Sequence, residues 1–187
     1  MWLNVGCGTH RAPSPWHNID TTKQSGPDIP QHDWVEPDQV IDPNEPLPFE
    51  DGSCDRVFLG HVLEHIPWEF VPDFLLDIRR IASHEVLLVG PDIYRCIDSY
   101  KRGIEPLSTL QSCLEHKDYP DDMLDWPGAP HHWNCHEARV IEALNRTGWH
   151  GVPVLDSKIL DDWPVVGYTD RWQFAVMAVS DGRAHPR

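Results

Sequence analysis

The sequence has few basic residues. Lys and Arg total 15 against 30 Asp and Glu, which gives a formal net charge of −15. Nucleic-acid phosphates are bound mainly through Lys and Arg, so we expect no nucleic-acid partner. A local basic patch could still form from Arg79, Arg80, Arg95, Lys101 and Arg102.

Long apolar runs and paired cysteines are missing too. No stretch is long and apolar enough to cross a bilayer and no signal-peptide pattern opens the chain, so we expect a cytoplasmic protein without a membrane partner. The five cysteines contain no C-x-x-C pair, which disfavours a disulfide scaffold or a Cys-rich zinc site. With 187 residues, 40% of them hydrophobic, the composition predicts a single domain, residues 1–187, with a real core.

Short apolar runs alternate with helical patterns or long crossovers, which predicts an α/β fold. The amphipathic stretches 67–82 and 135–147 are expected to be helices. The stretch 172–179 is apolar throughout from Phe174 onward, so it should be a central strand. Strands are expected at 1–6, 16–20, 39–42, 56–60, 85–89, 152–155 and 172–179. We expect residues 93–130 to form a lid or acceptor-binding insertion, and residues 180–187 to fray.

The stretch Trp2–Gly8, WLNVGCG, reads as a buried strand that turns at two glycines. Ligands of parallel α/β sheets bind at the carboxyl ends of the strands, so this turn could cradle a nucleoside-bearing cofactor. Asp20 and Asp42 end the next two expected strands, where a carboxylate could bind ribose hydroxyls or an adenine amine. Alternatively, each acid caps a turn and the glycine turn binds nothing.

Four segments of the sequence, LNVGCG, WHNID, PLPFEDGSCDRVFLGHVLEHIP and EVLLVGPD, resemble the class I S-adenosylmethionine-dependent methyltransferases. The third is similar to the "LPF…HVLEH" segment of a small-molecule branch. The resemblance covers residues 1–92 well and the part after Cys135 loosely. It implies a three-layer Rossmann-like sandwich with a mostly parallel seven-stranded sheet, an antiparallel last strand and S-adenosylmethionine as cofactor.

The resemblance also implies the site. Gly6 and Gly8 would face the methionine part of the cofactor, Asp20 the ribose and Asp42 the adenine. Gly60 and His61 would line the methyl-transfer site. The full cofactor-binding set it implies is Asn4, Gly6, Cys7, Gly8, Asp20, Asp42, Leu47, Gly60 and His61.

Methyl transfer to a hydroxyl needs a base within reach of the acceptor. His61 is the first candidate, with Asp92 and Tyr94 as others, although His61 could simply start a helix. His131, His132 and Trp133 are expected to line the acceptor site, although the tryptophan could equally belong to the core. These residues predict a methyltransferase acting on a small-molecule or glycan-like acceptor; the alternative is a non-catalytic cofactor-binding module in a larger assembly.

Two metal-binding patterns compete with this interpretation. His61 to His65 matches H-x-x-E-H, a zinc-peptidase motif if helical, and His132 and His136 are also spaced by four residues. We expect no metal, because the first motif directly follows a strand and a glycine. The family's helices before and after the first strand are missing here, so the cofactor site should be open, or closed by residues 93–130 or by a partner such as a second copy.

Overall fold

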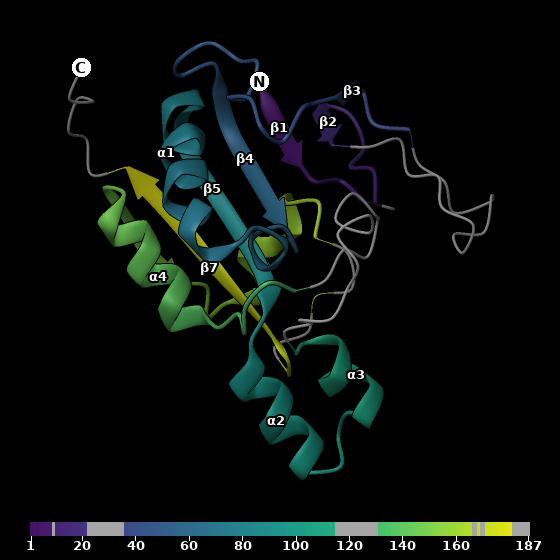
Figure 1. Cartoon of the computed structure of the whole chain (residues 1–187). Helices are drawn as coiled ribbons and strands as arrows, with labels where there is room; N and C mark the ends of the chain where they lie inside the picture. The colour runs from purple at the N-terminus through teal and green to yellow at the C-terminus, as the bar shows by residue number, and fades with distance from the viewer. Residues whose placement is uncertain (9, 22–35, 115–130, 166–167, 169–170, 181–187) are drawn as a thin grey trace.

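The computed structural model describes residues 1–8, 10–21, 36–114, 131–165, 168 and 171–180 (Figure 1). Seven strands form one sheet in the order β3-β2-β1-β4-β5-β7-β6. The first five pair in parallel, and β7 runs antiparallel to both of its neighbours. The strands are β1 (Trp2–Val5), β2 (Trp16–Asp20), β3 (Gln39–Val40), β4 (Cys54–Gly60), β5 (Ala82–Pro91), β6 (Trp149–Pro153) and β7 (Gln173–Ser180). The predicted Rossmann-like sheet is confirmed, including its antiparallel, internal last strand.

Two helices cover one face of this sheet, α1 (Val71–Ile81) and α4 (Glu137–Arg146) (Figure 1). The buried residues of α1 recur at helical spacing and include Leu75 and Ile78, which are fully buried. Burying one such side chain stabilises the fold by about 1.5–3 kcal/mol. Trp149 of β6 donates to the Leu75 carbonyl at 3.3 Å, which joins the sheet edge to α1.

The opposite face has a thinner cover. Residues 10–15 contain no helix, as the sequence predicted. Trp16 instead packs against Trp163, which follows the 3₁₀ helix η5 (Ser157–Asp162), with ring centroids 5.6 Å apart. The Arg56 guanidinium lies 5.3 Å from the Trp163 ring and extends this layer. Among the described residues, this cover includes loops, the short helix η5 and packed tryptophans.

Several expected boundaries shift. The strand predicted at 39–42 ends at Val40, because Pro43 lacks an N–H and Asp42 accepts a hydrogen bond from the Asn44 amide at 2.9 Å, forming a turn. A 3₁₀ helix, η3 (Trp68–Phe70), precedes α1, so that helix starts later than predicted. The strand expected at 152–155 is β6, three residues earlier.

The segment expected to form a lid or acceptor-binding insertion, 93–130, contains α2 (Ile93–Lys101) and α3 (Leu107–Ser112), which lie together beyond the end of the sheet (Figure 1). Its remainder, 115–130, lies outside the described residues, as does most of the expected frayed tail.

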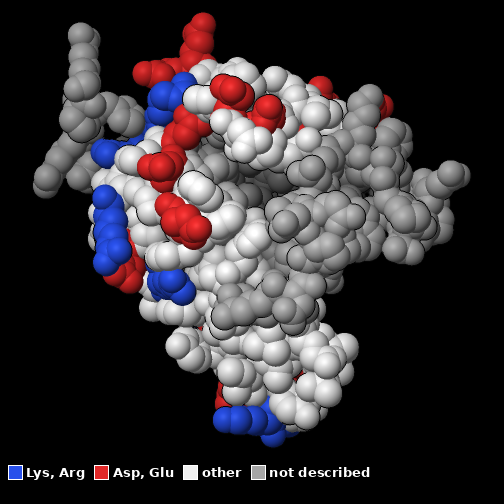
Figure 2. Space-filling model, viewed as in Figure 1, with Lys and Arg blue, Asp and Glu red and all other residues white. Residues whose placement is uncertain are grey.

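Charges of both signs are mixed on the face that carries α1 and α4, and blue side chains at the end of α2 lie beside a red one (Figure 2). Arg102 there pairs with Asp98 at 3.2 Å, and Arg80 pairs with Asp77 at 2.8 Å. Arg95 pairs with Glu137 at 2.7 Å. The candidate basic residues are thus spread over two helices, and these three arginines are neutralised by acids.

No helix among the described residues is long and apolar enough to span a membrane.

Candidate active site

The glycine turn after β1 lies close to two other segments, the end of β2 and the residues after β4. Gly6 and Gly8 have φ of 64° and 53°, values that favour glycine. The Gly8 amide donates to Asp20 Oδ2 at 2.8 Å, which joins the turn to the end of β2. A Cβ built on Gly6 would lie 2.7 Å from Val62 Cγ2, just beyond the end of β4. Three strand ends therefore meet at this turn, at the point where the strand order reverses.

The two acids lie near the ends of neighbouring strands, Asp20 as the last residue of β2 and Asp42 two residues after β3. Asp20 Oδ1 accepts from the Thr21 amide at 2.7 Å, and the Asp20 carbonyl accepts from the Ile41 amide at 2.9 Å. Asp42 follows directly and is exposed. Its carboxylate caps its own turn, so Asp42 matches the capping alternative in this structure, whereas Asp20 contacts the glycine turn itself.

His61 follows β4 with φ of 56°, a strained conformation for a residue with a Cβ. Its amide donates to the Val89 carbonyl at 2.8 Å, which fixes it beside β5. Its Nδ1 lies 3.0 Å from Glu64 Oε1, and its Nε2 lies 2.7 Å from Gln173 Nε2. Both ring nitrogens are thus oriented by side chains, one from Glu64 three residues along the chain and one from Gln173 of β7.

The His61–Glu64 pair is electrostatically coupled. Burial alone would lower the pKa of His61, but the hydrogen bond and charge of Glu64 outweigh burial and raise that pKa. Burial likewise favours neutral Glu64, which is 1% exposed, but His61, followed by His65 and His131, lowers the pKa of its carboxyl. Glu64 is therefore a buried carboxylate surrounded by imidazoles.

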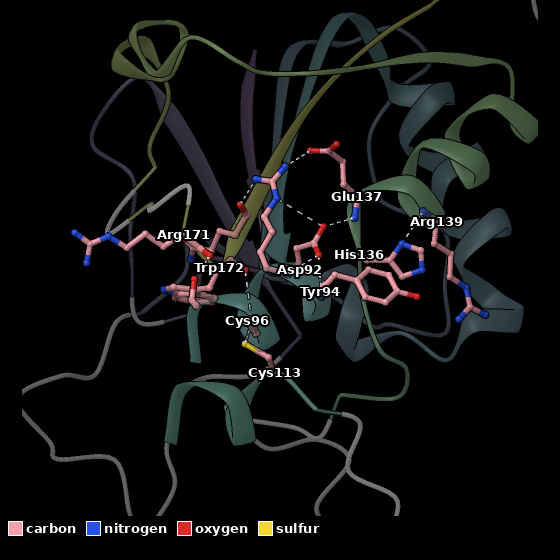
Figure 3. A network of polar contacts seen from close by, with 12 residues as sticks. Asp92, Tyr94, Cys96, Cys113, His136, Glu137, Arg139, Arg171 and Trp172 are labelled. Carbon is pink, nitrogen blue, oxygen red and sulfur yellow. Dashed lines mark hydrogen bonds and ion pairs between the residues drawn. The ribbon is translucent and has the colours of Figure 1, made fainter. Parts of the chain in front are cut away.

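Asp92 organises the end of β5 (Figure 3). Its Oδ1 caps α2 by accepting from the Tyr94 and Arg95 amides at 3.0 and 3.2 Å. Its Oδ2 accepts from the Glu137 amide at 3.1 Å, which joins α2 to α4. Both carboxylate oxygens are engaged in caps, so the structure favours a structural role for Asp92. Tyr94, by contrast, is 66% exposed and remains accessible to an acceptor.

Trp133 lies in the core. It is 3% exposed and its Nε1 donates to the Leu63 carbonyl at 3.0 Å, while its ring meets the Trp68 ring edge to face with centroids 4.9 Å apart. Its position matches the core alternative, and a role in lining the acceptor site stays a prediction. His131 and His132 are both half-buried and lie just before it.

Other members of the expected cofactor set are buried. Asn4, 2% exposed, donates from Nδ2 to Asn18 Oδ1 at 2.9 Å. Leu47, 6% exposed, belongs to the main core, and its amide donates to Asp77 Oδ2 at 2.6 Å. These two support the turn and the loop behind it. A Cβ built on Gly60 would lie 2.7 Å from the Phe58 ring, so packing explains that glycine.

Cys7 is also buried at the glycine turn, with 4% exposure. Burial is the main cause that raises the pKa of its thiol to about 12, and the nearby Asp20 carboxylate adds to it.

The H-x-x-E-H motif does not form a zinc-peptidase helix. His61 has a left-handed backbone, and only Leu63–His65 form a short 3₁₀ helix, η2. Glu64 bonds to His61 rather than pointing away from it. The separate His132–His136 pairing also fails to form on a helix, because His136 is the N-cap of α4 and His132 lies outside that helix.

Gln173 is the site residue that the sequence analysis missed. It is 3% exposed at the start of β7 and contacts His61. Its signal was present, since it is a single polar residue at the head of the apolar run QFAVMAV. Only the antiparallel course of β7 brings that residue to the end of β4.

Residues 3–89 match the family model described as a methyltransferase domain. This segment contains the glycine turn, Asp20, His61 and Glu64. The N-terminal part of the chain is therefore similar to methyltransferase domains. No curated protein is similar enough in sequence to be counted as a match.

Solved structures share the fold of this chain at low sequence identity. A SAM-dependent methyltransferase from Methanosarcina mazei is 13% identical with a TM-score of 0.53, covering 95% of this chain and 91% of its own. A Haloferax volcanii methyltransferase in complex with the Trm112 activator is 15% identical with a TM-score of 0.52, and the match covers 98% of this chain and 82% of that one. Magnesium protoporphyrin IX methyltransferase from Synechocystis, with bound SAH, is 14% identical at 0.50, covering 96% and 74%.

Proposed function

We propose that the chain binds S-adenosylmethionine at the carboxyl ends of β1, β2 and β4 and transfers its methyl group to a small-molecule or glycan-like acceptor. The observation that carries this proposal is the contact of the Gly8 amide with Asp20, beside a glycine that packs on the residues after β4. The match of residues 3–89 to a methyltransferase domain and the SAH bound by the Synechocystis enzyme support the choice of cofactor.

The residues fit the cofactor by their chemistry. Two glycines with positive φ leave the turn free of Cβ atoms, so a ligand can approach its backbone. Asp20 is half-buried and would exchange its bond with Gly8, or share it, on accepting the ribose hydroxyls. Asp42, on the next strand end, is assigned to the adenine side. Three buried residues lie behind this surface and support it: Asn4, Cys7 and Leu47.

S-adenosylmethionine, when bound, supplies an electrophilic methyl group, so the protein's task is alignment and removal of the acceptor proton. His61 is proposed as the general base. Glu64 Oε1 accepts a hydrogen bond from His61 Nδ1 and so favours the protonated ring. His61 Nε2 is then the nitrogen that takes the proton of the acceptor. Gln173 lies at that nitrogen and holds the ring until an acceptor takes its place. Tyr94 and His132 are proposed to contact the acceptor.

The test combines binding with turnover. Calorimetry should show binding of S-adenosylmethionine to the full chain, and methyl-labelled cofactor should then transfer label to a member of a panel of hydroxylated small molecules and sugars. His61→Gln should lower kcat/KM by roughly 10²–10⁴-fold, the usual contribution of a general base, with cofactor affinity unchanged. Absence of cofactor binding would contradict the proposal as a whole.

A non-catalytic cofactor-binding subunit is the second candidate. Residues 10–15 place no helix over the glycine turn, and the Haloferax volcanii relative was solved with an activator, so a partner or second copy could complete the site. Binding without transfer to any acceptor, together with an inert His61→Gln variant, would favour this candidate. The segment 93–130 is proposed as the lid if the chain is active alone.

A further inference from the structure

Glu64, His65 and His131 form a group of ligand-type side chains next to the proposed base. Each offers one ligand atom, and these three atoms lie within 4.8 Å of one another. The rings of His65 and His131 meet edge to face with centroids 5.0 Å apart. Sequence spacing could not show this group, because two members come from η2 and the third lies just before α4.

The group has an unbalanced charge and an unused ring nitrogen. Glu64 is 1% exposed, and a buried carboxylate requires a compensating positive charge. The groups that offset the Glu64 charge are three imidazoles, those of His61, His65 and His131. His65 Nδ1 is buried and has no hydrogen-bond partner among the described residues. A cation between these side chains would satisfy both features.

The backbone holds the two segments together at this point. The His132 amide donates to the Glu64 carbonyl at 2.8 Å. Trp133 Nε1 lies within hydrogen-bonding distance of the Leu63 carbonyl, at 3.0 Å, and of the Ile66 carbonyl, at 3.2 Å. These contacts fix His131 opposite η2, so the ligand atoms are brought together by the fold itself.

We propose that Glu64, His65 and His131 bind a divalent transition-metal ion, with zinc as the first candidate. Two imidazoles and a carboxylate suit zinc, whose bonds to such ligands are about 2.0–2.2 Å. The three ligand atoms, within 4.8 Å of one another, would have to close around the ion to reach that distance. Glu64 Oε1 is bonded to His61, which leaves Oε2 for the ion and makes His61 an outer contact of the site.

This site differs from the zinc-peptidase interpretation, because His61 is not a ligand and the motif is not helical. Three protein ligands leave a coordination position for water, the arrangement of zinc sites that bind an exogenous group. The ion would also tie the segment before α4 to η2. The metal-bound protein should therefore be more stable than the metal-free protein. Its ion should also keep one coordination position open near His61.

The experiment is a zinc titration of the full chain after removal of metal by a chelator, followed by calorimetry and metal analysis of dialysed protein. Wild-type protein should retain one zinc ion per chain. His65→Ala and His131→Ala should each weaken binding by more than about 100-fold, beyond the usual effect of an outer contact. His61→Gln should weaken it by about 10–100-fold.

His132→Ala is the matched control, because it adjoins His131 but lies outside the three-atom group. It should retain wild-type affinity. The proposal fails if wild-type protein binds zinc no better than the His131→Ala variant, or if His132→Ala loses as much affinity. Circular dichroism identifies any variant that does not fold, and the two histidine variants carry the test independently of each other. The assay contains neither cofactor nor acceptor, so it does not depend on the proposed function.

Discussion

The backbone amide of Gly8 donates a 2.8 Å hydrogen bond to the carboxylate of Asp20, across the gap between β1 and β2. The contact links a turn that exposes its backbone with an acid that can accept two further hydrogen bonds. It is the relationship on which the cofactor assignment rests.

Asp20→Ala should weaken S-adenosylmethionine binding by about 1–3 kcal/mol, the usual cost of losing a charge-assisted hydrogen bond. Titration calorimetry measures this directly. Asp73→Ala is a suitable control, because Asp73 is an exposed acid in the first turn of α1, and its removal should leave affinity unchanged. Equal affinities of the Asp20 variant and wild type would show that the ribose lies elsewhere.

Gly6→Ala should destabilise the fold for two reasons, its positive φ and the approach of the new Cβ to Val62 at 2.7 Å. Gly52→Ala measures the cost of the positive φ alone, because Gly52 has φ of 65° and nothing lies within 4 Å of an added Cβ. The control should cost about 1–2 kcal/mol in urea unfolding, and Gly6→Ala more.

Val62→Ala should relieve the steric part when combined with Gly6→Ala. In that background the penalty for Gly6→Ala, measured against Val62→Ala alone, should fall toward the Gly52 value. A penalty that stays unchanged would mean that the two residues are not in contact.

Cys7 should resist alkylation in the folded protein. Burial raises the pKa of its thiol to about 12, so the group stays protonated, and therefore unreactive, at all pH values well below 12. Iodoacetamide at pH 8, followed by peptide mass analysis, should leave Cys7 unmodified until the protein is unfolded in denaturant. Rapid labelling of Cys7 in the native protein would contradict the burial of the turn.

Cys96 and Cys113 should form a disulfide under mild oxidation. Their thiols are fully buried, and the two sulfur atoms lie 2.7 Å apart between α2 and α3 (Figure 3). A disulfide brings two sulfurs to about 2.05 Å, so a small shift suffices. With oxidised glutathione, the two thiols lose two protons and two electrons, and the glutathione is reduced to two thiols.

The expected readout is a mass lower by two hydrogens and the loss of two alkylation sites after denaturation. Cys96→Ser is the control and should show neither change. If both cysteines are still alkylated after oxidation and denaturation, α2 and α3 do not hold the two thiols at bonding distance.

Local patterns were enough to predict much of the fold. Helical spacing gave α1 because one side of that helix faces the sheet, and the apolar run at β7 correctly indicated an internal strand. The position of Asp20 at the end of β2 was predictable because a parallel sheet aligns the ends of its strands. These features depend on residues that are close in sequence.

The rest of the site depends on contacts between distant segments. Gln173 meets His61 across 112 positions of the chain, and His131 lies opposite Glu64 because of bonds made by its neighbours. Trp133 was assigned to the acceptor because sequence does not distinguish a stacking platform from a core ring. Asp92 is a candidate base in the sequence. The hydrogen bond that engages its Oδ2 comes from the Glu137 amide, 45 positions away, and the sequence alone does not show that contact.

The antiparallel course of β7 has a consequence for how this protein is made. A ribosome releases β1 to β5 first, yet β5 lacks its neighbour on one side until β7 emerges and inserts between β5 and β6. Gln173 reaches His61 only at that moment. The proposed pairing of His61 with Gln173 therefore forms only after β7, the last of the described strands in chain order, has docked beside β5.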